Sequence, residues 1–231
     1  GIKTGINFLG QRNRLGSYYL NYDVVYDTSL LASLSVDLIR EGLGEIFKIA
    51  LIKSKELFEL LEDSGDKLLD PAFYMSDTGT RIISLSVHLM LEELHDNPTE
   101  TNLKRCVDFG HSFSPGLEMA SLTSDSLEAI PHGIAVGADC VVTSIIANNR
   151  GLFDQGSLDR VLTLANTIDF LPNHPLYQEV EVMWSSMMDM TKHRGDNQNL
   201  PYPTAIGEFA FIQDLRFDEM AEAIVSFRRT I

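Results

Sequence analysis

The chain has 231 residues, of which 44% are hydrophobic, so it can bury one large core or two smaller ones. Its net charge of -15 and pI near 4.7 exclude the basic surface that nucleic acid or an anionic membrane requires. No apolar run reaches the roughly 18 residues that span a bilayer, and no signal-peptide core is present. Cys106 and Cys140 form no disulfide framework. We expect a folded cytoplasmic protein with neither a nucleic-acid nor a membrane partner.

The first part of the chain is predicted to be β structure. Residues 1–27 are rich in glycine, asparagine, tyrosine and β-branched residues, and residues 22–27 (YDVVYD) have the composition of a strand that leaves a turn. A lone hairpin has no sheet to pair with, so we expect this segment to be the last part of a larger sheet. Its unpaired strand edge is expected to bind the missing part or to aggregate.

Helical periodicity begins at Ser35 and continues through most of the chain. Apolar residues recur from Leu38 to Leu61 at helical spacing, which predicts an amphipathic helix or helix pair that ends near Gly65. Further helices are predicted at residues 76–95, 100–121, 132–150, 155–169, 176–193 and 215–229. The fold class is therefore predicted to be mainly α.

Three short motifs contain the residues best suited to chemistry. Glu45 and Lys48 in EGLGEIFK are three residues apart, so they share one helix face, although a surface ion pair is the more common reason for that spacing. His111 follows a glycine, and His132 follows a proline at a predicted helix start. Each histidine alone is typical of a hydrogen-bonded structural residue. Two histidines and a glutamate are also the ligands of a catalytic zinc site, but spacing does not show that they meet.

Five segments resemble the sugar phosphate cyclases, the family that contains dehydroquinate synthase. They are GIKTGINFLGQRNRLGSYY, EGLGEIFKIALIK, VDFGHSFSPGLEM, PHGIAVGAD and LPYPTAIGEFAF. The resemblance implies a two-domain enzyme, in which residues 1–34 end an N-terminal NAD-binding α/β domain and residues 35–231 form the C-terminal helical domain for metal and substrate. The sequence contains no glycine-rich dinucleotide loop. We therefore expect the chain to need an NAD-binding half, from the same or a separate polypeptide, and to work as a homodimer.

The resemblance also implies roles for individual residues. The metal ligands, for Zn²⁺ or Co²⁺, would be Glu45, His111 and His132. The residues that would line NAD and the substrate phosphate are Lys3, Arg12, Asn13, Leu31, Ala32 and Ser33. The catalytic residues would be Lys48, Asp108 and His193, together with Lys3 and Asn13, and the substrate-binding residues would be Lys104, Lys192 and Arg194.

Departures from the dehydroquinate synthase pattern indicate a different substrate. Asp108 replaces a usual asparagine, Pro115 a histidine and Met90 a lysine. The dehydroquinate synthase substrate carries a carboxylate, which Asp108 would repel, whereas the hydroxyls of a neutral polyol would donate to it. The pattern resembles the 2-epi-5-epi-valiolone synthases, although Ile134 in HGIAV replaces a usual glutamate and marks an atypical member.

Enzymes of that branch are carbon–oxygen lyases that cyclise sedoheptulose 7-phosphate. The implied steps are transient NAD-dependent oxidation, β-elimination of phosphate, reduction and intramolecular aldol closure. Three alternatives stay open at this point: a 3-dehydroquinate synthase, a desmethyl-4-deoxygadusol synthase, and a non-catalytic metal-binding helical domain.

Overall fold

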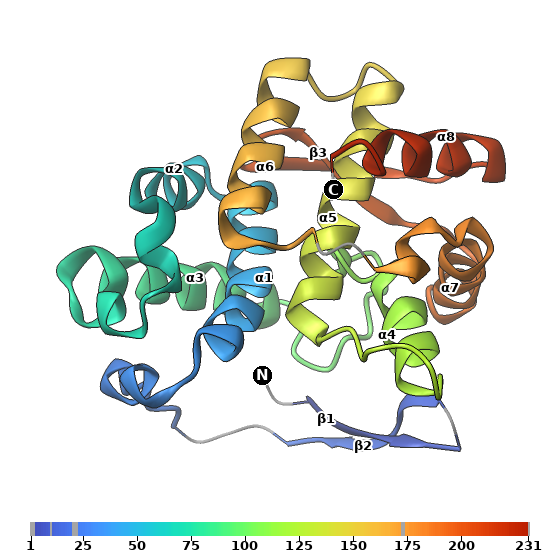
Figure 1. Cartoon of the computed structure of the whole chain (residues 1–231). Coiled ribbons are helices and arrows are strands. Elements are labelled where there is room, and N and C mark those ends of the chain that lie inside the picture. Colours follow the sequence, from blue (N-terminus) through green and yellow to red (C-terminus); the bar gives the residue numbers. More distant parts are fainter. Residues whose placement is uncertain (1–2, 10, 20–22, 172–173, 231) are drawn as a thin grey trace.

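A helical body with two short β-hairpins forms the structure (Figure 1). The computed structural model describes residues 3–9, 11–19, 23–171 and 174–230. The α-helices are α1 (Val36–Lys53), α2 (Lys55–Ser64), α3 (Asp77–His95), α4 (Ser114–Leu122), α5 (His132–Asn149), α6 (Gln155–Ile168), α7 (Val180–His193) and α8 (Phe217–Phe227). The strands are β1 (Lys3–Phe8), β2 (Gln11–Tyr18), β3 (Leu200–Ala205) and β4 (Glu208–Ile212). Short 3-10 helices include η1 (Thr28–Ser33), η4 (Cys106–Asp108) and η5 (Pro175–Gln178). The predicted mainly α fold is confirmed.

Helix α5 runs through the centre of the body and organises the core (Figure 1). Every residue from Gly133 to Ala147 is buried, as expected for a helix that is apolar on all sides. Helices α1, α4, α6 and α8 pack around it. Phe47 of α1 meets Phe170 edge-on, with 5.4 Å between the ring centroids. Among the described residues, no helix is long and apolar enough to cross a membrane.

Helices α1 and α5 cross with their backbones in contact. A Cβ atom added to Gly44 would lie 2.1 Å from the carbonyl oxygen of Gly133, and one added to Gly133 would lie 1.8 Å from that of Glu41. Neither position has room for a side chain. Glu45 directly follows one of these glycines and His132 directly precedes the other, so the crossing sets how close those two side chains come.

Local capping explains why the predicted helix pair breaks where it does. The Ser35 hydroxyl accepts the Leu38 N–H at the start of α1, and the Ser54 hydroxyl accepts the Leu57 N–H at the start of α2. Ser54 has an extended backbone, with φ −155° and ψ 106°. The two helices are therefore separate elements joined at this single residue.

Two elements near the N-terminal half of the chain differ from the prediction. The described residues 23–27 form no strand, and the hairpin lies earlier, with Thr4 opposite Ser17 and Ile6 opposite Leu15. Val24 and Val25 have high strand propensity, which has no effect without a pairing partner. The helix predicted over 100–121 begins only at Ser114, and both Glu100, with φ 56°, and Gly110, with φ 73°, have backbone conformations that no α-helix contains.

Prolines explain two further differences. Helix α7 begins at Val180 rather than at residue 176, because Pro175 opens the 3-10 helix η5. The β3–β4 hairpin was not predicted, and its first strand contains Pro201 and Pro203, which are unusual within strands. A two-stranded sheet tolerates them, because every strand in it is an edge strand.

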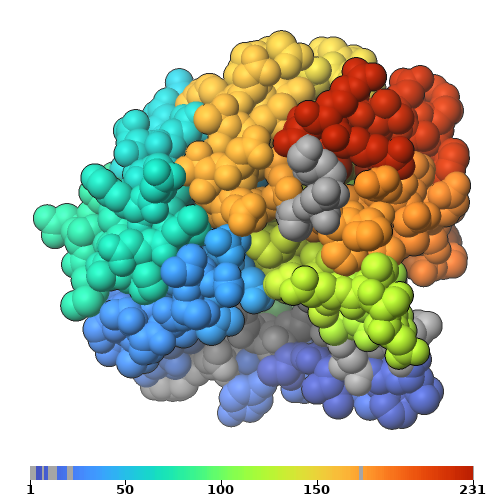
Figure 2. Space-filling model, in the orientation of Figure 1, coloured from blue at the N-terminus to red at the C-terminus, as the bar shows by residue number. Residues whose placement is uncertain are grey.

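The β1–β2 hairpin lies along one edge of the molecule (Figures 1 and 2). The Tyr18 hydroxyl donates to Glu100 Oε2 at 3.3 Å, and β2 also contacts α4. Large apolar side chains of the hairpin are exposed, including Ile6, Phe8 and Leu15. Among the described side chains of the hairpin, Tyr18 provides a polar link to the segment that follows α3.

The glycine crossing gives a first prediction. Gly44→Ala or Gly133→Ala should force α1 and α5 apart and lower the free energy of unfolding by about 1–3 kcal/mol or more. Gly42→Ala is the matched control, because Gly42 lies on the same helix and a Cβ there meets nothing within 4 Å. That change should stabilise the protein by about 0.4–1 kcal/mol. Urea denaturation measures all three, and equal stability of the Gly42 and Gly44 variants would contradict the close crossing.

Candidate metal centre

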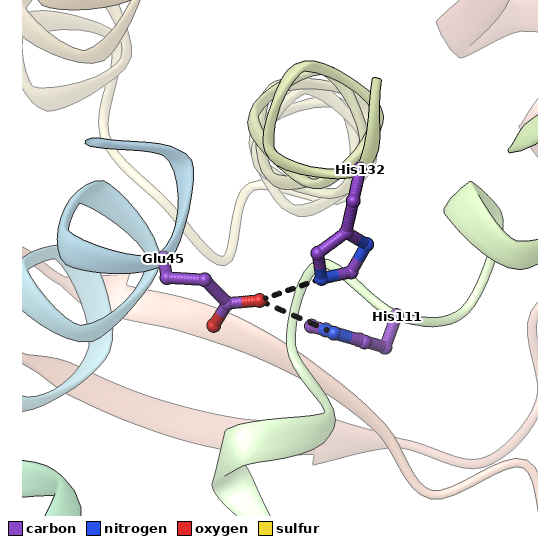
Figure 3. A group of neighbouring side chains, drawn as sticks. All are labelled: Glu45, His111 and His132. Carbon is purple, nitrogen blue, oxygen red and sulfur yellow. Dashed lines mark hydrogen bonds and ion pairs between the residues drawn. The ribbon is translucent and has the colours of Figure 1, made fainter. Parts of the chain in front are cut away.

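Glu45, His111 and His132 meet at the α1–α5 crossing (Figure 3). Glu45 comes from α1, His111 from the loop between η4 and α4, and His132 is the first residue of α5. Their candidate ligand atoms all lie within 4.8 Å of one another. Glu45 Oε1 is 3.4 Å from His111 Nε2 and 3.1 Å from His132 Nε2. The structure thus brings together three residues that are far apart in sequence.

Hydrogen bonds on the far side of each imidazole orient the rings. His111 Nδ1 is 3.2 Å from the carbonyl oxygen of Phe109, and His132 Nδ1 is 3.1 Å from Glu118 Oε1. Each Nδ1–H can donate outward, which leaves both Nε2 atoms as lone-pair donors toward the centre. Glu118 is a buried residue of α4 that was missed from the sequence. The only sign of its role in the sequence is that Glu118 is the single charged residue in the segment SPGLEMASL.

The electrostatics suit a positive ion. Burial raises the pKa of Glu45, but the charge of the Lys48 ammonium outweighs it and holds that pKa well below its usual range. Desolvation and the charge of Lys48 lower the pKa of His111 to about 3. A carboxylate and a neutral imidazole are therefore present at neutral pH, which is the protonation state that metal ligation needs. Two imidazole nitrogens and one carboxylate oxygen fit Zn²⁺ or Co²⁺ with a coordination position left open.

Lys48 is tied to this centre. Its ammonium lies 2.5 Å from Glu45 Oε2, and the side chain is only 3% exposed. The i,i+3 spacing seen in the sequence is therefore a buried ion pair beside the candidate ligands rather than a surface pair. Lys48 both orients Glu45 and places a fixed positive charge at the centre.

Asp108 lies inside a buried ion-pair network rather than alone. Its Oδ1 accepts from Arg105 Nη2 at 2.6 Å, and its Oδ2 accepts from Arg194 Nε at 3.2 Å. Arg194 is 3% exposed and also donates to Ser112 Oγ at 3.1 Å. Two guanidinium groups thus offset the charge of Asp108. The roles of Asp108 in substrate choice and of Arg194 in phosphate binding stay predictions.

The other predicted site residues stay predictions. The side chains of Lys3, Arg12 and Asn13 lie outside the described part of the structure. Those that the structure does place have these positions: Leu31, Ala32 and Ser33 in η1, Lys192 beside Asp189 at the exposed end of α7, His193 exposed at the last position of α7, and Lys104 with its ammonium 4.8 Å from the Phe211 ring centroid.

An apolar pocket opens beside Glu45, with a volume of about 180 Å³. Met90 and Leu91 of α3 line it, together with Ile46 and Ile49 of α1. Among the described residues that line it, none is a lysine or an arginine. The pocket therefore offers space next to the candidate metal ligands without a cation that would pair with a substrate carboxylate.

The ligand set gives a second prediction. Changing Glu45, His111 or His132 to alanine should abolish tight Zn²⁺ binding, since only two protein ligands would remain. His88→Ala is the control, because His88 lies exposed on α3 and pairs with Glu92. Metal analysis after gel filtration measures the bound zinc. Full zinc occupancy in His132→Ala would show that the assignment is wrong.

Comparison with known proteins places these features in a family. The family model described as 3-dehydroquinate synthase C-terminal matches residues 42–193. A 2-epi-5-epi-valiolone synthase of Streptomyces hygroscopicus subsp. jinggangensis is 38% identical over 98% of this chain and 54% of its own length. A demethyl-4-deoxygadusol synthase of Trichormus variabilis is 32% identical over 98% of this chain and 56% of its own length.

A solved structure is also similar over nearly the whole chain. It is ValA, a 2-epi-5-epi-valiolone synthase from Streptomyces hygroscopicus subsp. jinggangensis with NAD⁺ and Zn²⁺ bound. The TM-score is 0.92 at 37% identity, and the match covers 99% of this chain and 62% of ValA. The chain therefore spans about half the length of the curated relatives it matches.

Proposed function

The chain belongs to the 3-dehydroquinate synthase C-terminal family, and we propose that it is the metal- and substrate-binding part of a sugar phosphate cyclase. The proposed reaction converts sedoheptulose 7-phosphate to 2-epi-5-epi-valiolone with release of phosphate. The observation that carries the proposal is the convergence of Glu45, His111 and His132 beside the buried Lys48. Identity of 38% to a 2-epi-5-epi-valiolone synthase over 98% of the chain supports this substrate over the two related cyclase reactions.

The proposed enzyme has a second half that binds NAD. Residues 1–34 would end this NAD-binding α/β domain, and residues 35–231 would be the helical domain. Support comes from the relatives, which are nearly twice as long as their match to this chain, and from ValA, whose structure holds NAD⁺. The exposed apolar side chains of β1 and β2 suit a segment that another part of the protein covers. A homodimer of the completed enzyme is part of the same proposal.

The chain's own residues have definite tasks in this reaction. A divalent metal at the centre would supply Lewis-acid polarisation of substrate oxygens, and NAD would supply the transient oxidation. Glu45, His111 and His132 would hold the metal, with Glu118 fixing the ring of His132. Lys48 would hold its ammonium beside Glu45 and stabilise negative charge that develops on the substrate. Its burial strengthens that effect, because little water screens the charge.

Substrate choice would depend on the pocket beside Glu45. Met90 lines this pocket where the family pattern has a lysine, so the described lining offers apolar contact and neither a lysine nor an arginine to pair with a carboxylate. Asp108 would act through its arginine partners, because both of its oxygens are already engaged. A neutral heptulose phosphate fits such a pocket better than a carboxylated one, since an unpaired buried carboxylate is costly.

The third prediction tests the reaction. The chain should release phosphate from sedoheptulose 7-phosphate in an NAD-dependent way when it is co-expressed with the N-terminal half of the Streptomyces hygroscopicus relative. Phosphate release and product mass spectrometry measure the activity, and Lys48→Met in this chain is the inactive control. A complex that binds NAD and zinc yet releases no phosphate would favour a non-catalytic metal-binding domain.

The fourth prediction concerns Met90. In the same complex, Met90→Lys should raise kcat/KM for the carboxylated substrate of dehydroquinate synthase by about tenfold or more, because it adds a half-buried counter-ion. Met90→Leu, which keeps the pocket apolar, should leave the ratio of the kcat/KM values for the carboxylated substrate and for sedoheptulose 7-phosphate unchanged. If both variants change the ratio equally, pocket shape rather than charge controls the choice.

A further inference from the structure

The carboxylate of Asp139 is the buried group that the proposed chemistry leaves unused. Asp139 lies on α5 two helical turns after His132 and is 1% exposed. Its Oδ2 accepts three consecutive backbone N–H groups, those of Ser112 at 2.9 Å, Phe113 at 2.6 Å and Ser114 at 2.9 Å. These amides directly follow His111. Helix α5 carries His132, and through the Oδ2 atom of Asp139 it also binds the backbone that directly follows His111.

The three amides need such a partner. They lie at the start of α4, where backbone N–H groups have no acceptor within their own helix, and Phe113 at the cap position supplies no side-chain acceptor. Asp139 replaces the missing cap from a different helix, and the partial positive charge of the α4 N-terminus favours its ionised form. Burial raises the pKa of Asp139 to about 6, with the backbone hydrogen bonds opposing that rise. The carboxylate is therefore mostly ionised at neutral pH.

The loop that bears His111 is seated on the same face of α5. Gly110 has a φ of 73°, and a Cβ there would lie 2.8 Å from Cys140 Sγ and 2.9 Å from Val136 Cγ1. On the opposite side, Arg194 donates to Ser112 Oγ at 3.1 Å. The loop therefore packs on α5 at Gly110, directly before His111, and is hydrogen-bonded to α5 from Ser112 onward, directly after His111.

We propose that Asp139 is a positioning residue that holds His111 against His132 in the metal centre. Helix α5 supplies one ligand directly through His132 and fixes the second through the three amides bound by Asp139. The distance between the two histidines is then a property of a single rigid helix. This inference rests on the proposed metal site, and it concerns how that site is kept in shape before metal arrives.

A double-mutant cycle on the chain tests the inference. Asp139→Asn keeps the size of the side chain but replaces one oxygen by an NH₂ group and removes the charge. The Zn²⁺ dissociation constant, measured by competition with a chromophoric chelator, should rise about 10- to 100-fold. In a His111→Ala background the same change should alter the residual affinity by no more than about twofold, because the residue it positions is gone. The visible spectrum of the Co²⁺-loaded Asp139→Asn protein should shift toward that of His111→Ala.

Controls separate positioning from general damage. Thr143→Val removes only the hydrogen bond to Asp139 Oδ1 at 3.2 Å and should leave zinc affinity within about twofold of wild type. Equal losses from Asp139→Asn with and without His111 would overturn the proposal, as would unchanged affinity in the single variant. If Asp139→Asn does not fold, Asp139→Ser goes through the same cycle, and failure of both to fold would overturn the positioning role in favour of a purely structural one. Wild-type protein that binds no zinc would instead refute the metal site itself.

Discussion

The backbone contact between α1 and α5 is the constraint on which the candidate site depends. Gly44 and Gly133 let the two helices approach closely. A Cβ atom added to either glycine would collide with the backbone of the other helix. Glu45 and His132 adjoin these glycines, so their side chains meet just outside the contact, at 3.1 Å. A wider crossing with ordinary side chains at the contact would separate the carboxylate from the imidazole. The close packing of α1 on α5 therefore also sets the distance between Glu45 and His132 in the site.

The remaining parts of the site bring charge and orientation to that crossing. His111 arrives on a loop that packs on α5, and each histidine has an acceptor at its Nδ1. Lys48 keeps Glu45 ionised, and burial together with the same positive charge keeps His111 neutral. These groups are buried or half-buried, so little water competes with them. The centre is therefore ready for a cation without rearrangement of its ligands, which lowers the cost of binding.

Much of this arrangement could be predicted from the sequence, and the limits have physical causes. Helical periodicity located α1, α2, α3, α5, α6 and α8 to within a few residues, because each has a long stretch of apolar residues that must be buried. It failed near Gly110, whose positive φ is not helical, and at Pro175, which opens a 3-10 helix before α7. The resemblance to a family identified Glu45, His111 and His132. Glu118 and Asp139 were missed, since their roles arise from contacts across 14 and 25–27 residues that no local pattern encodes.

Asp108 shows a different limit. Its type and position were read correctly from the sequence, but the expected repulsion of a carboxylate assumed an unpaired charge. The structure pairs it with Arg105 and Arg194, neither of which periodicity could place beside it. The charge of a residue can be read from a sequence, whereas the field it produces depends on its neighbours in space.

The central claim is that Glu45, His111 and His132 bind a metal ion together. X-ray absorption spectroscopy of the zinc-loaded chain tests it most directly. The account predicts a first shell of nitrogen and oxygen at about 2.0–2.2 Å, with the multiple-scattering signature of two imidazoles that falls to one in His111→Ala. A first shell that contains sulfur at about 2.3 Å, or an imidazole signal that is unchanged in His111→Ala, would contradict it.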